Sequence, residues 1–70
     1  MPVMTARRLV ALLLQLGFFY ARQCGSHATY RHPDGRTTVI PMHTGDIASG
    51  TLRIILKSIK ITTEQLCELL

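Results

Sequence analysis

Residues 18–41 read FFYARQCGSHATYRHPDGRTTVIP, and this stretch decides the fold class. Aromatic and β-branched residues, which favour strands, are frequent in three runs, at residues 18–23, 27–32 and 37–40. Cys24-Gly25-Ser26 separates the first two runs, and Pro33-Asp34-Gly35-Arg36 separates the second from the third. Because proline presets φ and glycine supplies positive φ, both separators are typical of tight turns. The stretch therefore predicts three antiparallel strands joined by hairpins.

Helices are expected on both sides of these strands. Residues 5–16 are strong helix formers without internal glycine or proline, with Thr5 placed as N-cap and Gly17 as stop signal. Apolar residues repeat at helical spacing over 52–59, and a Thr-x-x-Gln capping box at 62–65 begins a short last helix. The fold class is therefore predicted as α+β, in the order α-β-β-β-α with a three-stranded antiparallel sheet and a short C-terminal helix. Such a sheet buries one face under its helices and leaves the other open.

The size of the chain limits what it can build. Seventy residues suffice for one small domain, which we expect to span residues 1–70, without repeats or linkers. A domain of this size buries only about 60% of its unfolded surface, so its stability is marginal without a partner. Apolar residues make up 47% of the chain, which is ordinary for a folded domain and too high for a disordered one.

Positive charge is the main clue to a partner. Eight lysines and arginines oppose four acidic residues, for a formal net charge of +4. On so small a body this charge attracts polyanions, which favours a nucleic-acid partner over a surface that merely keeps the protein in solution. Arg53, Lys57 and Lys60 form a basic stripe on the predicted second helix. That stripe is either a set of phosphate contacts or the solvated face of an amphipathic helix.

The cysteines and the N-terminal residues argue against several protein classes. Cys24 and Cys67 lack the spacing of a zinc site, and free thiols in the cytosol are favoured over one disulfide. Arg7 and Arg8 precede an apolar run at 9–14, as in a signal peptide, but the run is short and no cleavage site follows. The run is also far below the roughly 20 residues needed to cross a bilayer. We therefore expect a cytoplasmic protein without membrane, metal or cofactor.

Three histidines, His27, His32 and His43, are the candidates for chemistry. Imidazole has an ordinary pKa of about 6.5, so it both accepts and donates protons near neutrality. RNA carries its own nucleophile, so a ribonuclease without metal needs a base, an acid and positive charge at the phosphate. His32 before Pro33 is most simply a strand end, and His43 is most simply a loop residue. His27 differs because it follows Gly25-Ser26, a turn that lets a phosphate approach closely.

Strand alternation groups some of these residues. It places His27 and Arg31 on one face of the second strand and Tyr30 on the opposite face, under the helices. Arg22, on the first strand, adds a phosphate contact if it shares the face of His27. We set aside a Cys24–His27 dyad, because this pair lacks a third group to orient it. The sequence also shows no paired carboxylates, no glycine-rich phosphate loop and no Ser-His-Asp order.

These motifs together resemble the HicA toxin family over residues 9–62. The matching pieces, in chain order, are Leu16-Gly17-Phe18, Arg22-Gln23, Gly25-Ser26-His27, Arg31-His32-Pro33-Asp34-Gly35-Arg36, Val39-Ile40-Pro41, Gly45 and the segment from Gly50-Thr51 to Lys57. Each piece is short, and it is their order and spacing that make the resemblance specific. The resemblance implies a fold like that of double-stranded-RNA-binding domains. It also implies an mRNA endoribonuclease that arrests translation, paired with a HicB-type antitoxin that covers the active site.

The resemblance also assigns roles to residues. The essential histidine of the family lies in the Gly-Ser-His element, which makes His27 the expected catalytic base. The general acid is left open between His43, His32 and water. The residues expected to bind RNA are Gly25, Ser26, Arg22, Arg31, Arg53 and Lys57.

Four positions depart from the family pattern. Cys24 replaces a common lysine, which removes a positive charge beside the catalytic turn. Lys60 replaces a glycine that ends the helix, so the end of this helix is left open. Leu14 and Ile54 are apolar where polar residues are usual, which indicates a homodimer or antitoxin surface.

Two other functions are compatible with the sequence. One is an RNA-binding module without catalysis, which dense positive charge and the fold class would suit equally well. The other is a small interaction subunit that Leu14 and Ile54 fix to another chain. The effect of His27→Ala separates the nuclease from the binding module.

Overall fold

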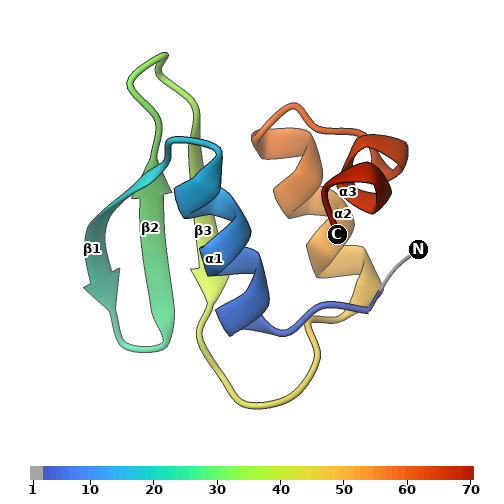
Figure 1. Cartoon of the computed structure of the whole chain (residues 1–70). Helices are drawn as coiled ribbons and strands as arrows, with labels where there is room; N and C mark the ends of the chain where they lie inside the picture. The colour runs from blue at the N-terminus through green and yellow to red at the C-terminus, as the bar shows by residue number, and fades with distance from the viewer. Residues whose placement is uncertain (1–2) are drawn as a thin grey trace.

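The computed structural model in Figure 1 describes residues 3–70. Its elements in chain order are α1 (Ala6–Gln15), β1 (Phe19–Cys24), β2 (His27–Arg31), β3 (Thr37–Pro41), α2 (Ser49–Ser58) and α3 (Thr63–Leu69). The strands form one antiparallel sheet in the order β1-β2-β3. The predicted α+β class, the element order and the short C-terminal helix are confirmed. No helix among the described residues is long and apolar enough to cross a membrane.

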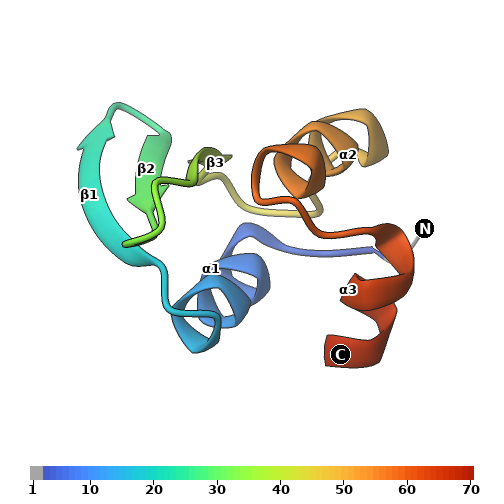
Figure 2. The ribbon, with the colours of Figure 1, turned by 90° about the horizontal axis from the view of Figure 1, so that it is seen from above.

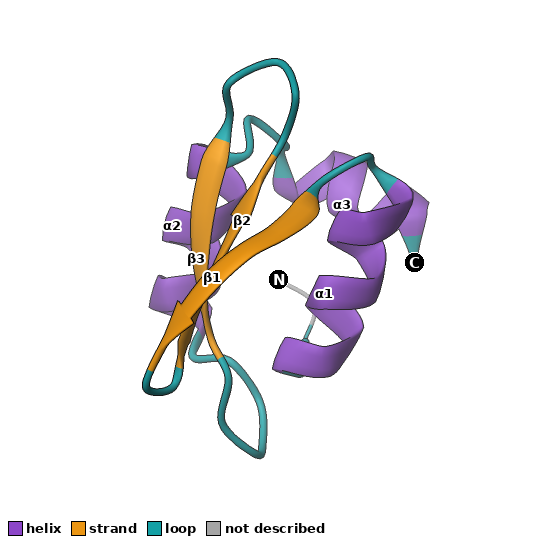
Figure 3. Cartoon of the chain, turned by 90° about the vertical axis from the view of Figure 1, so that its left-hand side faces the viewer, coloured by secondary structure: helices purple, strands orange, loops and turns teal. Residues whose placement is uncertain are grey.

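The helices gather on one side of the sheet. Figure 2 shows α1 against the concave face of the sheet and α2 beside β3, and Figure 3 shows β1 lying free at the other edge. The strands bury alternate residues toward the helices: Ala28 and Tyr30 on β2, and Thr38 and Ile40 on β3. The helical side chains that pack on them include Leu9, Leu12 and Leu13 from α1, Leu52, Ile55 and Leu56 from α2, and Leu66 from α3. The opposite face of the sheet is left open, as the alternation predicted.

Helix α1 begins and ends at the predicted signals. The Thr5 side chain accepts a hydrogen bond from the Arg8 N–H at 3.2 Å. At the other end Gly17 has a φ of +96°. The N–H groups of Gly17 and Phe18 donate to carbonyls of the last helical turn, at 3.1 and 2.9 Å. This is a Schellman motif, which satisfies carbonyls that a helix end leaves without partners.

The turn between β2 and β3 holds the ends of both long helices. His32 Nε2 lies 3.1 Å from the carbonyl oxygen of Leu16, the C-cap residue of α1. Arg36 Nη1 donates to the carbonyl of Ile59, the C-cap residue of α2, at 2.7 Å. One hairpin turn therefore supplies a donor to the last carbonyl of each helix.

Asp34 organises this turn from within. Its Oδ1 and Oδ2 accept hydrogen bonds from the backbone N–H and Nε of Arg36, at 3.0 and 2.8 Å. The backbone hydrogen bond from Arg36 is the main cause that lowers the pKa of the Asp34 carboxyl. Nδ1 of His32 lies 3.1 Å from the backbone nitrogen of Asp34 and 3.0 Å from Asp34 Oδ1. In the neutral ring this nitrogen accepts a hydrogen bond from the Asp34 N–H, and in the charged ring it donates to the carboxylate. The Phe18 ring packs edge-on against His32 and lies under the Arg36 guanidinium.

Helix α2 ends as sharply as α1, although Lys60 stands where glycine is favoured. Lys60 has a φ of +58°. The N–H groups of Lys60 and Ile61 donate to carbonyls of the last turn of α2, at 3.2 and 2.9 Å. The replacement of glycine by Lys60 thus leaves the helix end in place. Helix α3 then begins with both hydrogen bonds of the predicted capping box between Thr62 and Gln65.

Gly17→Ala is expected to destabilise the protein more than Gly35→Ala. Both glycines have nearly the same φ, +96° and +99°, so each substitution costs about 1–2 kcal/mol of backbone strain. A Cβ at Gly17 would also lie 3.0 Å from His32 Nε2, whereas a Cβ at Gly35 meets no atom within 4 Å. Disturbing the His32–Leu16 hydrogen bond adds about 1 kcal/mol. Urea unfolding of the two variants measures the difference, and equal losses would contradict this role of His32.

Lys60→Gly is expected to stabilise the protein by about 0.5–1 kcal/mol. Glycine removes the strain of a side chain at positive φ and gives back part of the gain as entropy of the unfolded chain. Lys57→Gly is the matched control, because it removes the same charge from the helical last turn of α2. That control should lose about 0.5–1 kcal/mol, the ordinary cost of glycine in a helix. A loss of stability in Lys60→Gly would show that the Lys60 side chain contributes more than its backbone strain removes.

Candidate functional site

The strand register shows which side chains share the open face of the sheet. Residues that face each other on antiparallel strands project to the same side. The open face carries three rows, each read from β1 to β3: Cys24, His27 and Pro41; Arg22, Thr29 and Val39; Phe19, Arg31 and Thr37. Successive rows are two residues apart, or about 7 Å. His27 is the centre of the row nearest the β1–β2 turn.

A β-bulge lies between the two halves of β1. Tyr20 pairs with Tyr30 and Arg22 pairs with Thr29, so Ala21 is an extra residue on β1. From Cys24, opposite His27, regular alternation places Arg22 on the open face, so the condition that the sequence left open for Arg22 is met. The bulge shifts the pairing of the residues before it, so that Phe19 and not Tyr20 shares this face. Tyr20 lies on the helix side, where its ring meets that of Tyr30 at a centroid distance of 5.8 Å.

The turn before His27 leaves its ring accessible. Gly25 and Ser26 form a two-residue connection in which Gly25 has a φ of +58°, as in a type II′ turn. A Cβ on Gly25 would meet no atom within 4 Å, so the space beside the turn is open. The His27 side chain is exposed, and among residues 3–70 no hydrogen bond engages its ring. Both ring nitrogens are therefore available to a ligand.

The loop after β3 starts beside the same turn. The Met42 N–H donates to the Ser26 carbonyl at 2.5 Å. His43 follows immediately and is exposed, with Nδ1 3.1 Å from the carbonyl oxygen of Thr44. With Arg7, His43 lines a groove between this loop and the start of α1, which lie side by side in Figure 1. His43 is therefore at the same end of the sheet as His27.

His32 lies in the turn at the opposite end of the sheet. Its Nε2 contacts the Leu16 carbonyl and its Nδ1 contacts Asp34, so both nitrogens already have partners within the fold. These contacts assign His32 a structural role.

The expected RNA contacts Arg53 and Lys57 lie elsewhere on the surface. Both are exposed on α2 and line a groove with Lys60 at the junction of α2 and α3. None of the residues that line this groove belongs to the sheet. Of the predicted basic contacts, the structure thus gathers Arg22 and Arg31 with His27 and leaves Arg53 and Lys57 apart.

The charge of the open face is positive. The acidic residues of the chain lie outside the strands, at Asp34, Asp46, Glu64 and Glu68. Cys24, directly opposite His27, and Cys67 are both exposed free thiols. Within residues 3–70, no three histidine, cysteine, aspartate or glutamate side chains gather to hold a metal ion. The open face therefore offers two guanidinium groups, one imidazole and no carboxylate.

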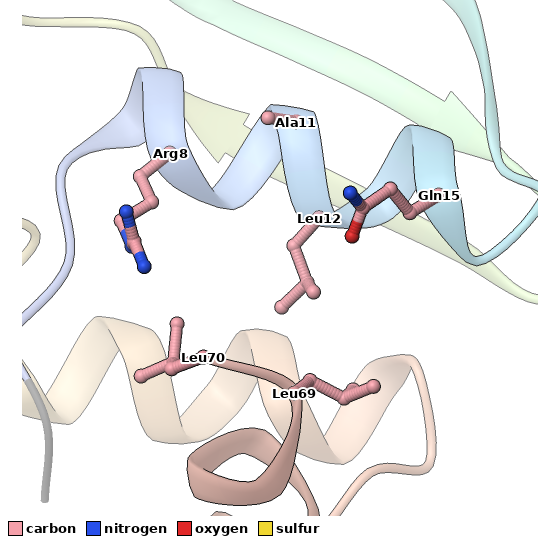
Figure 4. Close-up of a pocket in the computed structure, with 6 residues that line it drawn as sticks. All are labelled: Arg8, Ala11, Leu12, Gln15, Leu69 and Leu70. Atoms are coloured by element: carbon pink, nitrogen blue, oxygen red, sulfur yellow. The ribbon is translucent and has the colours of Figure 1, made fainter.

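A third groove lies between α1 and the end of the described chain. Figure 4 shows Leu12 of α1 pointing toward the segment that carries Leu69 and Leu70, with Arg8 on the side of Leu70. Ala11 and Gln15 complete the lining, which contains no histidine and no carboxylate side chain. This groove has packing surface and no acid–base group. Leu14 and Ile54 are exposed on α1 and α2, and their role as a dimer or antitoxin surface stays a prediction.

Two features of the structure could not be predicted from the sequence. Phe19 shares the open face with Arg31, and nothing in a strand of six exposed residues indicated which side chain points where. Pairing β1 with β2 through the bulge was the missing information. Arg36 was expected only as part of a turn, because its contact with Ile59 joins residues 23 positions apart.

The comparison with known protein families agrees with this picture. Residues 6–61 match the family described as "HicA toxin of bacterial toxin-antitoxin", a segment that runs from α1 through all three strands and past α2. A search of curated proteins finds no match to the chain. The matched residues include the Gly25-Ser26 turn, His27 and the β2–β3 turn that holds both helices. The chain therefore belongs to the HicA toxin family of bacterial toxin–antitoxin systems.

Proposed function

We propose that this toxin is an endoribonuclease that cuts mRNA without a metal ion and thereby arrests translation. Membership of the HicA family supplies the toxin role. The observation that supports the chemistry is the exposed imidazole of His27 on a face shared with Arg22 and Arg31 and free of carboxylates. A positive face recruits the polyanion, and an unoccupied imidazole supplies the base.

The proposed reaction uses the 2′-hydroxyl of RNA as nucleophile. Neutral His27 takes the proton of this hydroxyl, and the 2′-oxygen attacks the adjacent phosphorus. The bond from phosphorus to the 5′-oxygen breaks, and that oxygen receives a proton. The products are a 2′,3′-cyclic phosphate on one fragment and a free 5′-hydroxyl on the other.

Positive groups on the same face stabilise the phosphate during this reaction. Arg22 lies one row from His27 on the neighbouring strand, which suits a contact with the scissile phosphate. Arg31 lies two rows away, about 13 Å along β2, which suits a flanking phosphate. Gly25 leaves room for the backbone of the RNA, and the exposed Ser26 hydroxyl can donate to a phosphate oxygen. Donors fixed before the reaction stabilise the charge that develops in the transition state.

We assign proton donation to His43, with water as the alternative. His43 is exposed in the loop that begins beside the Gly25-Ser26 turn. Its Nδ1 donates to a backbone carbonyl, so Nε2 is the nitrogen that gives up a proton when the ring is charged. His32 is not a candidate because its two nitrogens hold the β2–β3 turn to α1 and to Asp34.

The proposal also covers the partner protein and the groove at the junction of α2 and α3. A HicB-type antitoxin that covers the open face would block access to His27. Arg53 and Lys57, in their separate groove, attract the RNA over a longer stretch and do not contact the scissile phosphate. Screening by salt weakens both kinds of contact.

The purified protein is expected to cut unstructured RNA in the presence of EDTA. His27→Ala should slow cleavage by about 10²-fold or more, because general acid–base groups contribute about 10²–10⁴-fold. End-group analysis should find the cyclic phosphate. His43→Ala should slow cleavage by less than His27→Ala, since water replaces the acid; circular dichroism checks that both variants fold. A requirement for magnesium, or full activity in His27→Ala, would refute the mechanism, and binding without cleavage would identify an RNA-binding module.

The two basic groups of residues are expected to behave differently. The double variant Arg22→Gln/Arg31→Gln should cut RNA at least tenfold more slowly at saturating substrate, because it loses contacts near the reacting phosphate. Its affinity should also depend less steeply on salt. The negative slope of log affinity against log salt concentration should become shallower by about 1.4, or 0.7 for each lost phosphate contact. The control Arg53→Gln/Lys57→Gln removes the same charge and should reduce affinity while keeping the rate at saturation. The reverse result would place the scissile phosphate at α2.

A further inference from the structure

Phe19 is the feature that neither the fold nor the proposed reaction uses. It lies on β1 directly opposite Arg31, on the open face of the sheet. Its side chain is 48% exposed, whereas the adjacent Phe18 is 3% exposed and supplies the aromatic ring that packs against His32 and Arg36. Leaving half of a phenyl ring in water gives up part of the stabilisation that its burial would provide. An aromatic ring held beside a guanidinium on a positive face is the arrangement that proteins use to bind unpaired bases.

We propose that Phe19 is a stacking platform for one unpaired base of the RNA, so that the substrate binds the open face as a single strand. The inference rests on RNA being the ligand of this face and adds the form of that RNA. Arg31 binds the phosphate of the nucleotide whose base stacks on Phe19. Val39, exposed in the middle row, gives the strand a second apolar contact on the way to His27.

The spacing of the rows places the stacked base beside the cleavage point and not at it. Phe19 and His27 lie in the two outer rows, about 13 Å apart along the strands. This distance is several times the rise of about 3.4 Å per nucleotide in a stacked strand. The base on Phe19 therefore belongs to a nucleotide that flanks the scissile one. The site holds the RNA at two points, and the segment between them crosses Arg22 and Thr29.

The stacking geometry selects against duplex RNA. In an A-form helix the bases stack on one another and their faces are not available to a side chain. A single strand presents those faces, and stacking on an aromatic side chain tolerates any base. Phe19 therefore favours unpaired RNA without imposing a strong sequence preference.

Tyr20 provides a matched control one residue away. It is also aromatic and about half exposed, at 55%, on the same edge strand. Because of its pairing with Tyr30, it lies on the opposite side of the sheet from His27. A base that stacks on Phe19 does not reach Tyr20. Because both residues lie on β1, a difference in RNA binding between variants at the two positions is caused by the face of the sheet and not by the strand.

Tryptophan fluorescence tests the proposal directly, because the chain contains no tryptophan. Phe19→Trp and Tyr20→Trp are each made in the His27→Ala background, so that the RNA stays intact. An unstructured RNA oligonucleotide should quench the emission of Phe19→Trp and leave that of Tyr20→Trp unchanged. A fully paired duplex of the same sequence should quench Phe19→Trp at least tenfold less effectively at equal concentration.

Affinity measurements give a second, independent readout. In the same background, Phe19→Leu should bind the single strand about tenfold more weakly, and Tyr20→Leu should bind as the parent does. Thermal melts check that both leucine variants fold. If Phe19→Leu does not fold, the quenching of Phe19→Trp and Tyr20→Trp still tests the stacking proposal. Equal quenching by duplex and single strand, or bound RNA without quenching of Phe19→Trp, would overturn the proposal. Because no arm measures cleavage, an inactive toxin whose Phe19→Trp is quenched would refute the nuclease and retain the platform.

Discussion

Two hydrogen bonds from one hairpin turn hold both long helices to the sheet. The last carbonyls of a helix have no partners within it, and a helix end that packs against other elements requires a donor from outside. His32 supplies that donor to Leu16 at the end of α1, and Arg36 supplies it to Ile59 at the end of α2. A guanidinium at the negative end of a helix dipole adds a favourable electrostatic contribution. Phe18, packed against both side chains, fixes the turn relative to the core.

This arrangement divides the sheet into an end whose polar side chains are engaged within the fold and an end whose polar side chains are exposed. The β2–β3 turn uses its histidine, its aspartate and Arg36 for contacts within the protein, so these groups are not available to a substrate. The residues of the β1–β2 turn, at the other end, are exposed, and among residues 3–70 His27 has no hydrogen-bond partner for its ring. Two neighbouring histidine-containing motifs therefore differ in what the fold asks of them. The reaction proposed for His27 would take place where the fold does not depend on the histidine.

Much of this architecture follows from local sequence rules, and the failures have identifiable causes. The caps at Thr5 and Gly17, the capping box at Thr62 and the faces of β2 all obey short-range chemistry, so they were predictable. The face on which Phe19 lies was not, because it depends on a bulge that no local pattern marks. The hydrogen bonds of His32 and Arg36 to the helix ends could not be predicted for another reason, since they join residues 16 and 23 positions apart.

The bulge at Ala21 has a consequence for how relatives of this protein are compared. Ala21 contributes a methyl group and no chemistry, yet its place outside the pairing decides which of Phe19 and Tyr20 shares the face of His27. If Ala21 paired with Tyr30 instead, the residues before it would exchange faces, while the residues between it and the turn would keep theirs. The composition of the open face can thus change through strand pairing alone, without a substitution at any position on that face. An aromatic residue at the same sequence column in two relatives is equivalent only if both carry the bulge.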